Sequence, residues 1–136
     1  MKKLCLVFLI ACGSPQHAAP PPDAAPSRMV IDEKVAAQTA EGMIEMLQTM
    51  VAITKKHADD CDAMAADLEK VYAVAQPLFD VTAAAKGDPE ATRLLKDAWN
   101  QREAEAGPLR DQLGDGLLVC KENANVVRAV RDMPTW

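Results

Sequence analysis

The chain has 136 residues, of which 49% are hydrophobic and 26% charged, and its formal net charge is −5. This length suits one domain of modest size, and the acidic balance argues against a nucleic-acid binder, which normally carries a basic stripe. Aromatic residues make up only 4% of the chain, while Ala, Leu, Val and Met supply most of its apolar side chains. Because this composition favours helices over a β-sandwich, we expect an all-α fold.

The first eleven residues have the pattern of an export signal. Lys2 and Lys3 precede an apolar run from Leu4 to Ala11, which is too short to cross a bilayer about 30 Å thick as a helix. The stretch Leu9-Ile10-Ala11-Cys12 then resembles the lipobox of bacterial lipoproteins. The resemblance implies cleavage before Cys12, acylation of that cysteine and anchoring of the protein in a membrane. In that family, Gly13 at the next position implies the outer membrane.

Residues 12–29 are expected to form a disordered tether. Five of the sixteen residues from Gly13 to Arg28 are proline, and the stretch has no apolar period that could bury a core. A polyproline-like spacer extends about 3.1 Å per residue, so this one could hold the rest of the chain up to about 50 Å from the membrane. His17 lies in this stretch, and we assign it no role.

Residues 30–136 are predicted to be a helical bundle. The first helix is expected from Val30 to His57, because apolar residues recur there at alternating spacings of three and four. The second is expected from Asp60 to Lys86, capped by Asp59 or Asp60 and continuing past Pro77. Gly87 should end it in the left-handed conformation, and Asp88-Pro89 should begin the next helix.

The third helix has two interpretations. The alternating spacing continues from Leu95 to Cys120, which favours one long helix kinked at Gly107-Pro108 and hence an antiparallel bundle of three long helices. Alternatively, Gly107-Pro108 forms a hairpin, and the domain is a four-helix up-down bundle. A short helix from Val126 to Met133 should follow, and Trp136 is a candidate to fold back onto the bundle.

The cysteines favour the first interpretation. Cys5 belongs to the export signal and Cys12 to the lipid anchor, which leaves Cys61 and Cys120 for an oxidising compartment where disulfides persist. A rise of 1.5 Å per residue brings these two cysteines to one end of the bundle only if the third helix returns without a hairpin. We therefore predict a Cys61–Cys120 disulfide, which would stabilise the fold by about 4 kcal/mol in the loop-entropy model.

A second resemblance covers roughly residues 40–133. The run from Cys61 to Leu68 (CDAMAADL), followed about sixty residues later by a second cysteine and a short helix, is similar to small exported bacterial helical proteins of unknown function. This alanine-rich pattern is weakly specific, and the resemblance implies a fold but no activity.

No catalytic pattern stands out in the predicted domain. Hydrolase and metalloprotease motifs are missing, no cysteine is left free as a nucleophile, and Cys-x-x-Cys-His is absent, so we expect neither an enzyme nor a haem or other cofactor. The sequence therefore predicts a non-enzymatic envelope lipoprotein that contacts another envelope component. The alternative is a small-molecule or metal carrier, because Met43, Met46, Met50 and His57 share one helix face and thioethers select Cu(I). A methionine stripe at this spacing is more often core, and we predict no metal site.

Overall fold

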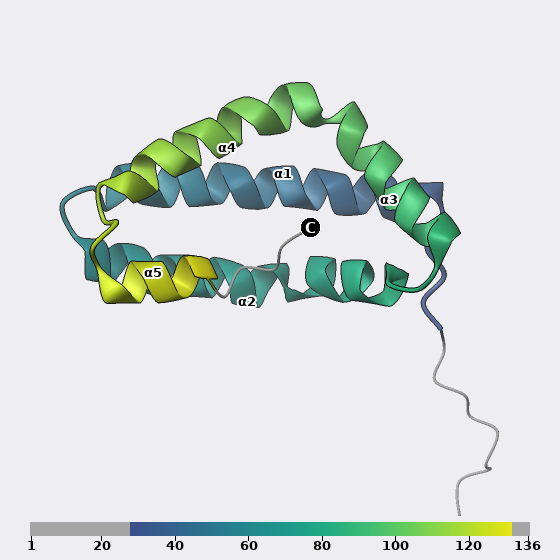
Figure 1. The fold of residues 1–136 in the computed structure, drawn as a ribbon, viewed down its shortest axis with the longest axis horizontal. Helices are drawn as coiled ribbons and strands as arrows, with labels where there is room; N and C mark the ends of the chain where they lie inside the picture. The colour runs from purple at the N-terminus through teal and green to yellow at the C-terminus, as the bar shows by residue number, and fades with distance from the viewer. Residues whose placement is uncertain (1–27, 132–136) are drawn as a thin grey trace, which may run out of the picture.

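The computed structural model describes residues 28–131, and every regular element in that range is a helix. These elements are α1 (Glu33–Lys56), α2 (Cys61–Ala85), α3 (Pro89–Gln101), α4 (Glu103–Leu118) and α5 (Ala124–Arg131). α1 and α2 lie antiparallel, α3 and α4 form an arch over α1, and α5 lies along the first half of α2 (Figure 1). The predicted all-α bundle is confirmed.

The helix ends follow the capping residues of the sequence. Asp32, Asp60 and Asp88 each accept a backbone N–H of the helix that they precede, and Pro89 is the first residue of α3. Gly87 has a φ of +86°, so it ends the α2 connection in the left-handed region, as predicted. Pro77 lies inside α2, which continues past it.

The break in the third long helix is not where the sequence indicated. The prediction of a kink at Gly107-Pro108 is wrong, because both residues lie inside α4 and the chain bends at Arg102. The hairpin alternative does not form either, since α3 and α4 both run back along α1. Pro108 has no N–H for the carbonyl of Ala104 and its ring crowds that carbonyl, so its disturbance falls on the preceding turn. The backbone changes direction just before that turn, where the Arg102 N–H bonds to the Trp99 carbonyl.

The predicted apolar positions form the core. Met50, Met64, Leu68 and Ala106 are completely buried, and Met43 and Met46 are nearly so. Two glycines bring other helices close to α1. A Cβ on Gly116 of α4 would lie 2.3 Å from the Thr54 hydroxyl, and one on Gly42 would lie 2.8 Å from a methyl of Leu78 on α2.

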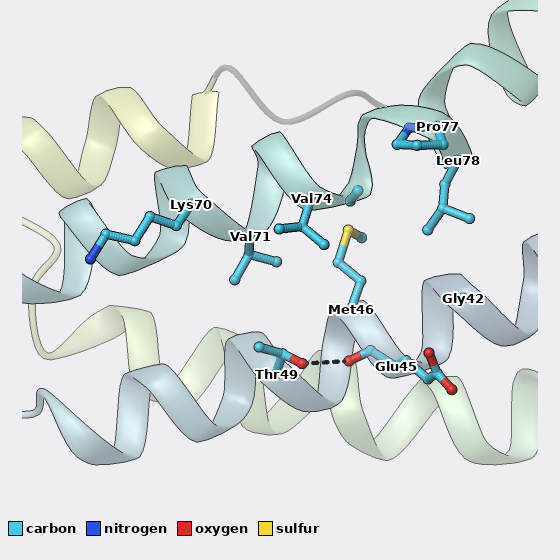
Figure 2. Close-up of a pocket in the computed structure, with 10 residues that line it drawn as sticks. Gly42, Glu45, Met46, Thr49, Lys70, Val71, Val74, Pro77 and Leu78 are labelled. Carbon is cyan, nitrogen blue, oxygen red and sulfur yellow. Dashed lines mark hydrogen bonds between the residues drawn. The ribbon is translucent and has the colours of Figure 1, made fainter.

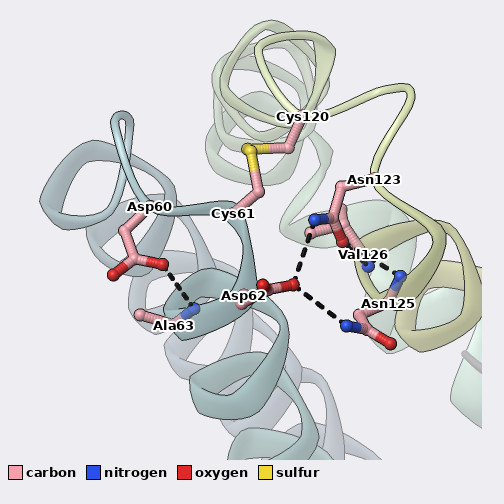
Figure 3. The surroundings of a disulfide bond; sticks show 8 residues. All are labelled: Asp60, Cys61, Asp62, Ala63, Cys120, Asn123, Asn125 and Val126. Atoms are coloured by element: carbon pink, nitrogen blue, oxygen red, sulfur yellow. Dashed lines mark hydrogen bonds between the residues drawn. A yellow bond between two sulfur atoms is a disulfide. The ribbon is translucent and has the colours of Figure 1, made fainter.

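The predicted disulfide is confirmed and closes one end of the bundle. Cys61, the first residue of α2, is bonded to Cys120, just after α4, with their Cα atoms 5.5 Å apart (Figure 3). Next to it, Asp62 accepts hydrogen bonds from the amide groups of Asn123 and Asn125, which holds the start of α5 on α2. Asn123 also caps α5 by accepting the Val126 N–H.

Several predictions fall outside the described residues. These are the export signal of residues 1–11, lipidation of Cys12, nearly all of the tether at residues 12–29, and the placement of Trp136. The structure neither supports nor contradicts them. α5 begins at Ala124, two residues before the expected Val126, because Asn123 provides the cap. Its predicted end at Met133 also lies beyond the description.

A candidate docking groove between α1 and α2

An open groove of about 450 Å³ lies between α1 and α2 (Figure 2). Met46, Val71, Ala75 and Leu78 form its apolar floor, and Figure 2 shows Val71 and Leu78 reaching from α2 towards α1. The lining also includes Gly42, Glu45, Thr49, Lys70, Val74 and Pro77. Thr49 donates its hydroxyl proton to the Glu45 carbonyl, so this polar side chain is already bonded within its own helix.

Val74 gives the groove an exposed apolar wall. Its side chain is 82% exposed, the highest value among the large hydrophobic residues of the described range. Val74 lies off the seam that packs Val71 and Ala75 against α1, so it stands on the outer side of α2 beside Pro77. Single exposed apolar residues are common, but one that borders an apolar groove is typical of a contact surface.

The two walls of the groove carry opposite charges. Glu45 lies on the α1 wall and Lys70 on the α2 wall. Lys70 donates to Asp67 one turn earlier, with a distance of 2.8 Å from Nζ to the nearer oxygen. Asp67 also contacts His57 Nε2, and these hydrogen bonds hold the pKa of Asp67 well below its usual value, with Lys70 contributing most. One end of the groove therefore lies beside the hydrogen-bonded side chains of His57, Asp67 and Lys70, and its α1 wall carries the carboxylate of Glu45.

A second apolar hollow, of about 330 Å³, lies between α4 and α5. Leu117, Val126 and Val130 line it, and the half-exposed or exposed side chains of Leu118 and Val127 stand at its edge. Its cationic residues are Lys121 and Arg131. This hollow is smaller and no acidic side chain lines it, so we take the α1–α2 groove as the candidate functional site.

The residues raised by the copper hypothesis are in structural positions. Met43, Met46 and Met50 are buried on the inner side of α1, and Met46 alone among them reaches the groove. His57 is engaged by Asp67, with 2.8 Å between Nε2 and the carboxylate oxygen. Within residues 28–131, no group of three His, Cys, Asp or Glu side chains is placed to hold a metal ion.

The groove was missed by reasoning from the sequence. The alternating spacing identifies which residues face the core, but Val74 and Lys70 lie outside that pattern and read as ordinary surface positions. The available signal was a cluster of small or apolar residues on the outer side of one helix: Ala63, Ala66, Val74, Pro77 and Val81.

Comparison with known proteins gives no relative for this chain. No family model, no curated protein and no solved structure matches it. No helix in the described part of the chain is both long and apolar enough to cross a membrane.

Proposed function

We propose that this protein is a lipoprotein of the bacterial cell envelope, anchored in the outer membrane through Cys12, and that it acts as a non-enzymatic interaction module. Its α1–α2 groove is the contact site, and the ligand is a helical surface of another protein chain. The observation that carries the proposal is the groove itself, which is open, apolar and bordered by the exposed side chain of Val74.

The form of the groove suits a helix as its ligand. The furrow between the two antiparallel helices presents an apolar surface over residues 42–49 and 70–78, on which another helix can place residues at i, i+3, i+4 and i+7. The walls would orient this helix, because Glu45 favours a cation and Lys70 an anion on the incoming chain.

The disulfide supports the proposed location. Such bonds persist in exported proteins and are rare in a reducing cytosol. The Cys61–Cys120 bond agrees in this respect with the charged and apolar pattern of residues 1–11 and with the cysteine at position 12. Arg28, where the described chain begins, contacts Asp88 at the end of the bundle opposite the disulfide. A lipid at Cys12 would therefore attach through that end.

Carriage of Cu(I), the alternative function, has less support. It would require Met43 and Met50 to leave the core in order to join Met46 on an ion from solvent, and that movement would expose apolar surface. Metal analysis of protein purified from its native envelope tests this alternative directly, since a carrier should contain nearly one ion per chain.

The proposed function is tested by crosslinking in cells followed by isolation of the full-length lipoprotein. We compare the wild type with Val74→Glu in the groove and with Val119→Glu, a matched change at a residue that is 62% exposed at the end of α4. Crosslinked partner chains should be lost in Val74→Glu, kept in Val119→Glu and reduced in Cys12→Ala. Identical crosslinking in all four proteins would contradict the proposal.

A further inference from the structure

The groove lies on a face that no other described helix covers. α3 and α4 pack on α1 and α5 packs on α2, whereas the outer furrow between α1 and α2 stays open. A three-helix bundle with one open furrow can be completed by a further helix pair. We propose that a second copy of this chain covers it, with the α1–α2 faces of the two copies packed together. This inference rests on the proposed function, because it names the chain that occupies the same groove.

The area of this face is close to that of a stable interface. α1 has 24 residues and is therefore about 36 Å long, and two adjacent helices are together about 20 Å wide. The whole outer face of the two helices thus projects to at most about 700 Å² per copy, with the groove at residues 42–49 and 70–78 as its apolar part, against roughly 800 Å² per partner in a standard protein interface.

The charges on the walls select one arrangement of the two copies. A two-fold axis along the groove places α1 of one copy on α2 of the other, so the Glu45 wall meets the Lys70 wall. A two-fold axis across the groove places α1 on α1 and sets each wall against its like-charged copy. Opposite charges across an interface fix the register and like charges disfavour it, so the first arrangement is preferred.

The side chains can span the distance that this arrangement requires. Gly42 lies level with Leu78, so Glu45 lies near the level of Ala75, and Lys70 lies about five residues further along the groove. Five residues of helix correspond to about 7.5 Å, a gap that a glutamate and a lysine can close together once the Lys70 side chain exchanges Asp67 for Glu45 of the second copy. The exposed Val74 would then lie against α1 of the second copy, close to Glu45.

The same arrangement agrees with the position of the tether. An axis along the groove keeps the two copies pointing in the same direction, so both Arg28 ends lie at one end of the dimer. Two chains anchored through Cys12 in one membrane could form it without crossing their tethers. An axis across the groove would send the two tethers to opposite ends, about 36 Å apart.

The test uses full-length lipidated chains in their native envelope. Two differently tagged copies, one Glu45→Cys and the other Val74→Cys, are co-expressed and treated with a short bismaleimide. We expect mixed dimers at least about fivefold above those from Val74→Cys alone, and background only from Val119→Cys, a matched exposed position outside the groove. Dimers through Val74→Cys alone in a yield equal to that of the mixed pair would overturn the arrangement, and background in all samples would overturn pairing.

Charge reversal gives an independent readout, the co-purification of one tagged copy with the other. Glu45→Lys or Lys70→Glu alone should reduce it at least about fivefold, and both changes in one chain should restore it. If co-purification did not recover in the double variant, Glu45 of one copy would not lie opposite Lys70 of the other. A chain that does not pair, but whose crosslinks to other proteins are lost in Val74→Glu, would refute this inference and leave the proposed function standing.

Discussion

On two sides of α1, a glycine allows a neighbouring helix to approach closely, but only one of these two interfaces is closed along its length. On the side towards α4, Gly116 removes a Cβ that would lie 2.3 Å from Thr54, and the helices close on each other. On the side towards α2, Gly42 makes room for Leu78, yet the furrow opens beyond it into the groove beside Val74. The contact between Gly42 and Leu78 therefore does not close the whole α1–α2 interface. The outer side of α2 carries small and exposed apolar residues, which leave the neighbouring surface of α1 uncovered.

The largest expected effect comes from the disulfide that closes one end of the bundle. Replacing Cys61 and Cys120 together by Ser should lower the free energy of unfolding by about 4 kcal/mol, since the bond closes a loop of 59 residues in the unfolded chain. Urea unfolding of the variant and of the reduced wild type should agree. A loss below about 1 kcal/mol in both would show that the disulfide does not stabilise this bundle.

The next effect separates two glycines of one helix. Gly116→Ala should cost about 2 kcal/mol more than Gly114→Ala, because the new methyl group would clash with Thr54 at position 116 but meets no atom within 4 Å at position 114. Both changes gain the same helix propensity, so their difference isolates the contact. Thermal unfolding of the two variants measures it, and equal stabilities would mean that α4 does not approach α1 as described.

A smaller effect is expected on the open side. In Gly42→Ala, the methyl group meets the terminal carbons of Leu78, a flexible half-buried side chain at the groove that can rotate away. The gain of about 1 kcal/mol in helix propensity should roughly offset the crowding, so stability should change by less than about 0.5 kcal/mol. If Gly42→Ala destabilised the protein as much as Gly116→Ala, the two sides of α1 would be equally closed.

The smallest effect is one of pH at the disulfide end. Hydrogen bonds from Asn125 and Asn123 lower the pKa of Asp62 below its usual 3.8. Its contribution is fully present above pH 3.8 and is lost as the pH falls through the lowered value, when the protonated carboxyl no longer favours these bonds. Protection of the α5 amides from hydrogen exchange, relative to the unfolded chain at the same pH, should therefore decrease as the pH falls below 3.8, and less so in Asp62→Asn. If the wild type and Asp62→Asn lost protection equally in acid, a group other than Asp62 would be responsible for the pH dependence.

Much of the fold was readable from the sequence because its signals are local. Asp60, Gly87 and Asp88-Pro89 carry the chemistry of helix ends, and the structure places caps and turns at these residues. The disulfide followed from the number of cysteines and from helix lengths. The bend at Arg102 was not predictable in this way, because no glycine or proline marks it and the proline responsible lies six residues further on.

The candidate site was less predictable than the fold. A groove is a property of two surfaces and of the spacing between them, whereas a sequence period reports only which side of each helix is buried. Val74 and Lys70 gave no signal of their own, and Met43, Met46 and Met50, which did, are part of the core. The methionines that suggested metal binding pack in the core, and the groove becomes visible only when α1 and α2 are placed side by side.

The occupancy of the groove in the native envelope tests the central claim most directly. The measurement is the rate of maleimide labelling of Val74→Cys, taken in intact envelopes and again in dilute, detergent-solubilised protein, with Val119→Cys as the reference for access. We predict that Cys at position 74 is labelled at least about tenfold more slowly in the envelope, relative to the reference, and that this protection disappears on dilution. Equal relative rates in both preparations would show that the groove is empty and would contradict the account.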